Sequence, residues 1–351
     1  MGNKKYLSIL EEIKKHGGKE ESNVNDKILI CDGLNTFIRV FSAIPTTNDD
    51  GIHIGGIIGF LKSIAYTTKM LNTTRTIVVF DGKGGSSRRR KLYPEYKNKR
   101  RGKIRLNRIN EYENIEDERH SMFMQLSRCV EYLETLPLTI ISVDNIEADD
   151  VIAYISKQLF TDSKIMIMST DKDFLQLVNN RISVWSPTKK KLYKPETLKE
   201  EYEITSNNFL TYRILEGDKS DNIPGVNGIG IKTAIKRFPQ LLEEKNVSIN
   251  DILKISNKKK DELKIYQNVL DSEKQLKLNY KLMQLNNVDI SGGAKLKINR
   301  VVNGKIQELI KSKFQTMFIE DRMFGALPNL ESWLMLNWTT LNRFAKINNG
   351  S

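Results

Sequence analysis

Five short apolar runs recur between residues 27 and 186, and longer amphipathic stretches separate them. The runs are rich in Val and Ile and have the length of buried strands. The separating stretches, such as 55–71 and 118–136, repeat apolar positions at helical spacing. Apolar strands that alternate with helices predict a mainly parallel α/β sheet covered on both faces. The runs are KILICD (27–32), TIVVFD (76–81), LTIISV (138–143), KIMIMS (164–169) and ISVWS (182–186).

From about residue 205 the pattern changes, because no further strand run is convincing and helical spacing dominates. The chain therefore divides into an N-terminal extension (1–26), an α/β domain (27–204) and a helical domain (205–351). The extension is expected to begin with a short amphipathic helix. The last apolar segment, which includes Trp338, is expected to pack as a helix on the core.

The overall composition, with 39% hydrophobic and 28% charged residues, is that of an ordinary globular protein. No apolar run of the sequence reaches the 18 residues of a membrane span, and the first residues lack the apolar core of a secretory signal. Cys31 and Cys129 lie in apolar stretches and are expected to be buried thiols of a reducing compartment. We expect a monomeric cytoplasmic protein, located in the host cytoplasm if a phage encodes it.

The net charge of +13 is concentrated in one segment of the chain. Between Lys83 and Arg108 there are twelve basic residues and a single acid, Glu95. A solvated basic surface is the simplest interpretation of a charge run. This concentration, however, favours a polyanionic partner such as nucleic acid.

Acidic residues follow four of the five predicted strands. A single acid at such a place usually caps a turn or the first turn of a helix. Because the carboxyl ends of parallel strands meet at one edge of a sheet, several of them together are expected to converge there. A further acidic group occurs where the helical region begins. The acids are Asp32, Asp81, Glu147, Asp149, Asp150, Asp171 and Asp173, followed by Asp218 and Asp221.

So many anions cannot share a small space without compensating positive charge. Mg²⁺ supplies that charge and binds carboxylates, waters and phosphate oxygens together. Zinc is a poor fit, because His16, His53, His120 and the two cysteines have no ligand spacing. The same histidines have no plausible partners for nucleophilic catalysis. Two divalent ions about 4 Å apart activate water for attack at phosphorus, so the pattern predicts phosphodiester hydrolysis.

A glycine-rich turn, NIPGVNGIGIKTA, spans residues 222–234. It is not a Walker A loop, because Ile231 is one residue too many before Lys232 and the preceding segment is helical rather than a strand. A helix–hairpin–helix fits better, since its glycines let backbone N–H groups approach a phosphate. A plain connection between two helices is the alternative.

Together these motifs resemble those of the 5′ nuclease (flap endonuclease) superfamily. The matching pieces, in family order, are CDGLN, FDG, PEYKNKR, IEADD, STDKDFLQL and GDKSDNIPGVNGIGIKTA. The long helical C-terminal region makes the T-even-type phage ribonuclease H most similar in layout. The resemblance implies a PIN-like α/β core, a basic helical arch over residues 83–120 and a helix–hairpin–helix at 208–238.

The resemblance also implies two metal sites. Asp32, Asp81, Glu147 and Asp149 would surround the first ion, and Asp171, Asp173 and Asp218 would hold the second, with Asp150 and Asp221 nearby. The ions would be Mg²⁺, for which Mn²⁺ substitutes. A K⁺ ion is a candidate at the glycine turn.

Nucleic-acid contacts follow from the same resemblance. Lys97 and Arg100 match a basic pair at the scissile phosphate and would share one face of a helix. Tyr96 matches an aromatic residue on which a base stacks. The other contacts are Lys83, Arg88, Arg89, Arg90 and Arg101 in the arch, and Gly225, Gly228, Gly230, Lys232 and Thr233 at the glycine turn.

The function implied is that of a Mg²⁺-dependent 5′→3′ exonuclease and flap endonuclease, which removes RNA primers or 5′ flaps during replication. Its substrates would be DNA and RNA–DNA hybrids with 5′ ends or flaps, and a single-strand-binding protein or sliding clamp is a candidate partner. A non-catalytic binder of branched DNA and a PIN-type ribonuclease are the alternatives. The full set of acids argues against the first, and the arch and glycine turn argue against the second.

Overall fold

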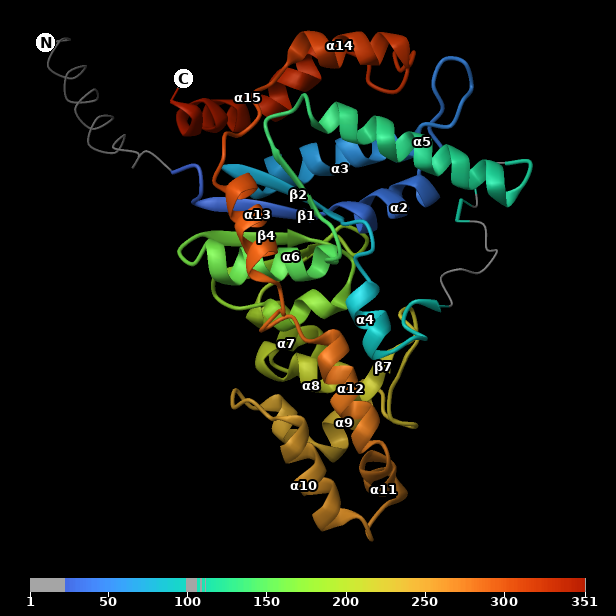
Figure 1. Cartoon of the computed structure of the whole chain (residues 1–351), viewed down its shortest axis with the longest axis vertical. Helices are drawn as coiled ribbons and strands as arrows, with labels where there is room; N and C mark the ends of the chain where they lie inside the picture. The colour runs from blue at the N-terminus through green and yellow to red at the C-terminus, as the bar shows by residue number, and fades with distance from the viewer. Residues whose placement is uncertain (1–22, 99–105, 108, 111, 351) are drawn as a thin grey trace, which may run out of the picture.

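A six-stranded sheet forms the centre of the α/β domain (Figure 1). The computed structural model describes residues 23–98, 106–107, 109–110 and 112–350, so the predicted N-terminal helix and part of the arch lie outside it. All five predicted strands form, within one residue of their expected ends, and they pair in parallel. Among the described residues there are also three short strands that the sequence pattern did not predict: the antiparallel β6 (Lys191–Tyr193) at the edge of this sheet, and the pair β7 (Gly217–Asp218) and β8 (Ile223–Pro224). The order is β3 (Thr139–Val143), β2 (Arg75–Asp81), β1 (Lys27–Asp32), β4 (Lys164–Met168), β5 (Ile182–Ser186), β6 (Lys191–Tyr193).

The sheet separates two hydrophobic cores, and successive residues of each strand face opposite cores. In β1, Ile28 and Ile30 belong to one core, whereas Leu29 and Cys31 belong to the other. All four of these side chains are fully buried, as a central parallel strand covered on both faces requires.

The Leu29 face of the sheet carries helices from both ends of the chain. They are α2 (Gly33–Ala43), α3 (Gly55–Leu71), α5 (Ile115–Leu133), α14 (Lys311–Glu320) and α15 (Leu330–Asn349). Phe314 and Trp338 are fully buried in this core. The expected packing of the last apolar segment on the core is therefore confirmed. The C-terminal helices share this core with the α/β sheet, although the sequence pattern grouped them with the helical domain.

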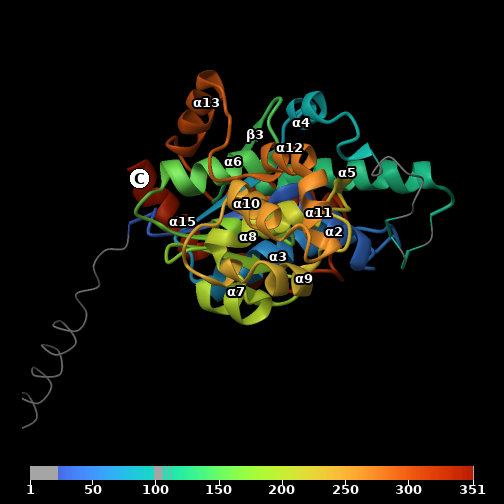
Figure 2. The ribbon, with the colours of Figure 1, turned by 90° about the horizontal axis from the view of Figure 1, so that it is seen from below.

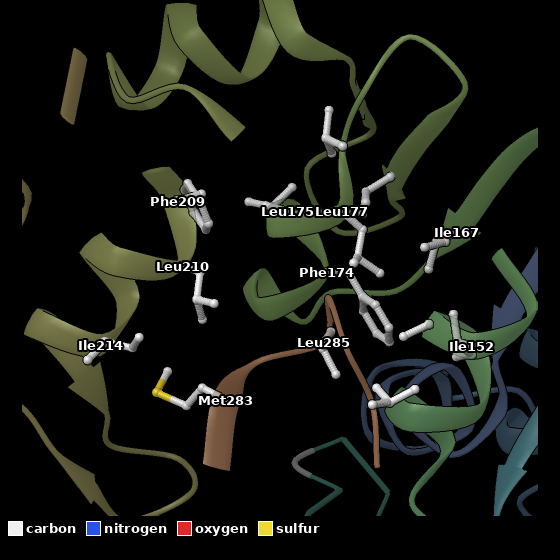
Figure 3. Packing of buried hydrophobic residues seen from close by; sticks show 14 of the residues in the cluster. Ile152, Ile167, Phe174, Leu175, Leu177, Phe209, Leu210, Ile214, Met283 and Leu285 are labelled. Carbon is white, nitrogen blue, oxygen red and sulfur yellow. The ribbon is translucent and has the colours of Figure 1, made fainter. Parts of the chain in front are cut away.

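The helical domain extends from the opposite core (Figures 1 and 2). Figure 3 shows how the core continues between the domains: beyond β4, Leu175 lies toward Phe209 of α8, while Phe174 lies beside Ile152 in the same core. After β6 the chain continues through α7 (Pro195–Tyr202), α8 (Ser206–Glu216), β7 (Gly217–Asp218), β8 (Ile223–Pro224), α9 (Ile231–Arg237), η4 (Pro239–Leu242), α10 (Ile249–Lys259), α11 (Lys264–Asp271), α12 (Glu273–Met283) and α13 (Gly292–Val302), and α13 packs back on β3. In the part of the chain that the structure describes, no helix is long and apolar enough to cross a membrane.

Candidate active site

The carboxyl ends of the parallel strands bring the predicted acids to one edge of the sheet. Asp32 ends β1 and Asp81 ends β2, while Asp149 lies in the first turn of α6 (Ala148–Tyr154) after β3. Asp171 follows β4 and precedes the 3₁₀ helix η3 (Lys172–Leu177). Together with Lys97, these four carboxylates line one hollow.

A second hollow adjoins the first. Asp171, Thr170 and Asn35 line both of them. The second is completed by Asp218 and by a residue that the sequence analysis did not consider, Arg213. Five of the seven acids that the resemblance assigned to two metal sites (Asp32, Asp81, Asp149, Asp171 and Asp218) therefore line two neighbouring hollows that share Asp171, whereas Glu147 and Asp173 line neither.

Local hydrogen bonds orient the acids of the first hollow. Asp32 caps α2 by accepting from the Asn35 N–H (3.3 Å) and also accepts from the Ser169 hydroxyl (2.9 Å). Asp81 accepts from the Ala148 N–H (2.8 Å), which ties the end of β2 to the start of α6. These two acids thus do accept backbone N–H bonds at helix starts, as the simple interpretation of them as caps predicts. Capping uses only part of each carboxylate's capacity, because a carboxylate offers about four lone-pair sites.

Electrostatics distinguish these acids from ordinary caps. Burial, and then repulsion from Asp81 and Asp171, raises the pKa of Asp32 to about 7. The pKa of Asp149 is raised by burial and by Asp171, and the pKa of Asp171 by burial and by Asp221 and Asp218. Burial is the largest cause of each rise, and repulsion between the neighbouring acids adds to it, as expected where several carboxylates share a small space.

Glu147 has a different environment from the four acids of the first hollow. Its side chain is 2% exposed and contacts both the Arg89 guanidinium and the Lys97 ammonium, and it accepts from the Tyr96 hydroxyl (3.2 Å). Although burial acts in the opposite direction, Arg89 and Lys97 hold the pKa of Glu147 below its ordinary value. Glu147 therefore already has its counter-charges and does not line the first hollow.

Asp150 is likewise paired and lines neither hollow. Two parallel bonds of 2.9 Å join its carboxylate to the Arg89 guanidinium, and Arg88 adds a third contact at 3.1 Å. Asp221 accepts the Lys97 N–H through its backbone carbonyl (2.9 Å), and its carboxylate lies 3.9 Å from the Lys97 ammonium. Asp150 therefore lies at the start of the arch, whereas Asp221 lies close enough to the hollows to raise the pKa of Asp171.

Two predicted nucleic-acid contacts need correction. Arg89, in α4 (Ser87–Leu92), is 3% exposed and also donates to the carbonyl of Leu282 (2.8 Å), so it anchors the arch to α12. Tyr96 is 2% exposed and packs in the core, where no base reaches its ring. Within a basic run, the sequence does not reveal which members turn inward.

The remaining arch residues are placed only in part. Lys97 lines the first hollow, as expected, but its φ of +56° lies in the left-handed region, so the predicted helix around it is wrong. Arg100 and Arg101 lie outside the described residues. Lys83 is exposed, and Arg88 and Arg90 are half-buried.

A cation that lines the second hollow bridges Asp218 and the adjacent Asp173. Arg213, on α8, donates from Nε to Asp173 (2.9 Å) and from Nη2 to Asp218 (2.6 Å). Burial, and then Asp171, raises the pKa of Asp173 to about 7 despite this contact. Burial also acts on Asp218, but the Ser220 hydroxyl and Arg213 hold its pKa below the ordinary value. The sequence signal that could have identified Arg213 was its place about one helical turn before the acidic loop that contains Asp218.

The glycine turn has the backbone geometry that its sequence suggested. Gly228 has a φ of +86°, and a Cβ on Gly225 would lie 2.0 Å from the Glu216 carbonyl, so both positions need glycine. Asn279 of α12 braces the turn by donating to the carbonyls of Ile214 (3.0 Å) and Pro224 (2.8 Å). Gly228, Gly230 and Lys232 are exposed, and Thr233 is half-buried.

The donor set of the hollows suits hard divalent cations. All the acids that line them offer oxygen, the ligand that Mg²⁺ prefers. Within the described ranges, no three acidic, histidine or cysteine side chains form a ready metal-binding group.

The parallel sheet, the acids at its carboxyl edge and the glycine turn define a phosphodiester-cleaving nuclease. Two family models cover most of the chain: "5′-3′ exonuclease, N-terminal resolvase-like domain" matches residues 27–203, and "5′-3′ exonuclease, C-terminal SAM fold" matches 204–301. The chain belongs to the 5′–3′ exonuclease family. It is therefore a 5′ nuclease, and the predicted fold class and superfamily are confirmed.

Individual relatives agree with this assignment. The 5′-3′ exonuclease of Buchnera aphidicola (strain APS) is 29% identical over 83% of this chain and 93% of its own length. The thermostable DNA polymerase I of Thermus thermophilus is 33% identical over 67% of this chain, which corresponds to 26% of that longer protein. Among solved structures, the bacteriophage T5 D15 flap endonuclease in a complex with DNA and metal ions has a TM-score of 0.59 at 24% identity, covering 84% of this chain and 99% of that one.

Proposed function

We propose that this 5′ nuclease cleaves 5′ flaps and 5′ ends of DNA, and RNA in RNA–DNA hybrids, with two Mg²⁺ ions. The observation that carries the proposal is the group of four carboxylates (Asp32, Asp81, Asp149 and Asp171) that line one hollow, three of them with raised pKa values. The first ion would be held there, and the second by Asp171, Asp173 and Asp218. When bound, such ions activate a water and stabilise the leaving oxygen.

The chain's own cations then have separate tasks. Lys97 lies at the first hollow, held against Glu147, where its ammonium suits a non-bridging oxygen of the scissile phosphate. Lys172 and Lys219 are exposed on the rim of the second hollow and suit flanking phosphates. The exposed part of the glycine turn, with Lys232, suits the duplex backbone and a K⁺ ion.

The relatives support this substrate class. The T5 neighbour is described as a flap endonuclease bound to DNA and metal ions, and several bacterial relatives are DNA polymerase I proteins. We therefore propose a replication role, in the cytoplasm, in which the protein acts as a monomer on RNA primers or 5′ flaps.

A cleavage assay on 5′-labelled flap, nicked and hybrid substrates tests the proposal. Wild-type protein should cut in Mg²⁺ and not in EDTA. Asp171→Asn should lower the single-turnover rate by more than about 100-fold, beyond the usual effect of an outer-shell partner, because Asp171 lines both hollows. Binding of the flap should survive. Binding by the wild type without metal-dependent cleavage would instead identify a non-catalytic binder.

A further inference from the structure

Arg213 occupies the second hollow with every guanidinium nitrogen engaged. Nε donates to Asp173 (2.9 Å), Nη2 to Asp218 (2.6 Å), and Nη1 to Glu216 (2.5 Å) and to the carbonyl of Gly217 (3.2 Å). The side chain is 6% exposed, so these contacts are largely removed from water. A guanidinium with this number of partners is fixed in position and orientation.

The acids joined by Arg213 come from different parts of the chain. Asp173 lies in η3 of the α/β domain, whereas Asp218 follows α8 at the start of the helical domain, 45 residues later. Only the packing between the domains brings them together. Phe174 and Ile214, the sequence neighbours of Asp173 and Arg213, are both buried in that interface (Figure 3).

The contacts leave part of each carboxylate available. Oδ1 of Asp218 is filled by the Ser220 N–H (2.7 Å), the Ser220 hydroxyl (2.7 Å) and the Asp221 N–H (3.2 Å), and Arg213 binds Oδ2. Arg213 binds only Oδ1 of Asp173. Because each carboxylate oxygen has two lone pairs, Oδ2 of Asp218 and both oxygens of Asp173 retain sites for a further ligand.

We propose that Arg213 is a positioning residue that holds Asp173 and Asp218 at the spacing required by the second divalent ion. This inference rests on the proposed function, since it assigns Arg213 to the second of the two ions. Lysine cannot replace it, because a single ammonium is a point charge and does not reproduce two bonds directed from separate nitrogens.

The test counts Mn²⁺ ions bound to DNA-free protein by electron paramagnetic resonance, so it does not depend on cleavage. Arg213→Lys keeps the positive charge but removes the planar guanidinium that donates from several nitrogens. It should lower the affinity for one of the two Mn²⁺ ions by about 10–100-fold and leave the affinity for the other unchanged. Arg213→Met is a second variant in case the first does not fold. It should lower the affinity for the same Mn²⁺ ion. Circular dichroism and thermal unfolding in EDTA establish that each variant is folded.

Arg128→Lys is the matched control. Arg128 also binds three acids, Glu131, Glu320 and Asp321, but it joins α5 to α14 on the other side of the sheet. Both ions should bind this variant as in the wild type. If folded Arg213→Lys binds two Mn²⁺ ions as tightly as the wild type, or more tightly, the positioning role is refuted. If the wild type binds no Mn²⁺ and cuts no flap, the proposed function itself fails.

Discussion

Glu147→Gln separates the two roles that Glu147 can have in this site. The family resemblance assigns Glu147 to the first metal ion, whereas the structure pairs it with Arg89, Lys97 and Tyr96. Glutamine has nearly the same shape, but it removes the charge and replaces one acceptor oxygen with an NH₂ donor. If Glu147 is an anchor for the arch, the substitution should destabilise the protein and misplace Lys97 without removing a bound ion.

The expected magnitude follows from the partners that remain. Removing one member of a buried ion pair usually costs about 3–5 kcal/mol, because the other charge is left uncompensated. Here Arg89 keeps its two bonds to Asp150, and Lys97, whose side chain is 16% exposed, keeps Asp221 within 3.9 Å. We therefore expect about 2 kcal/mol, the usual range for a hydrogen bond to a charged group.

Thermal unfolding in EDTA measures this change. Unfolding entropy of about 2.1 cal/mol/K per residue over 351 residues makes 2 kcal/mol equivalent to about 3 °C in Tm. Glu131→Gln is the control, because Glu131 is 48% exposed and pairs with Arg128 at the surface, so its effect should stay within about 0.5 kcal/mol. Loss of one bound Mn²⁺ ion with an unchanged Tm would refute the anchoring role and restore Glu147 as a ligand.

Two further predictions concern pH and nucleic-acid binding. In the folded protein the pKa values of Asp32 and Asp173 are raised from 3.8 to about 7, so between these pH values the native state binds more protons than the unfolded chain. In EDTA, Tm should therefore fall as pH rises from 5 to 7 and then level off, and added Mg²⁺ should reverse the fall. A Tm that rises over this pH window would contradict the assignment. Lys232→Ala should reduce by about 0.9 the magnitude of the slope of the log binding constant for duplex against log salt concentration. The control is Lys277→Ala, because Lys277 pairs with Glu273 on α12, and this variant should leave the slope unchanged.

The sequence predicted the parts of the site that follow from sheet topology alone. Parallel strands carry their final residues to one edge, so Asp32, Asp81, Asp149 and Asp171 could be grouped without knowing any side-chain contact. The partner of each acid could not be predicted in the same way. Arg89 and Glu147 are separated by 58 residues, and Arg213 and Asp173 by 40, and no local pattern encodes such pairings.

The acids that share one edge of the sheet therefore differ in whether arginine or lysine side chains of the protein neutralise their negative charge. Glu147 and Asp150 have arginine and lysine partners and secure the arch. Among the described residues, Asp32, Asp149 and Asp171 form no ion pair, and burial together with their acidic neighbours raises the pKa of each. Asp173 and Asp218 are intermediate, because one guanidinium serves both. Negative charge that folding leaves uncompensated reduces stability. In this protein such charge lies where its carboxylates can bind a divalent cation.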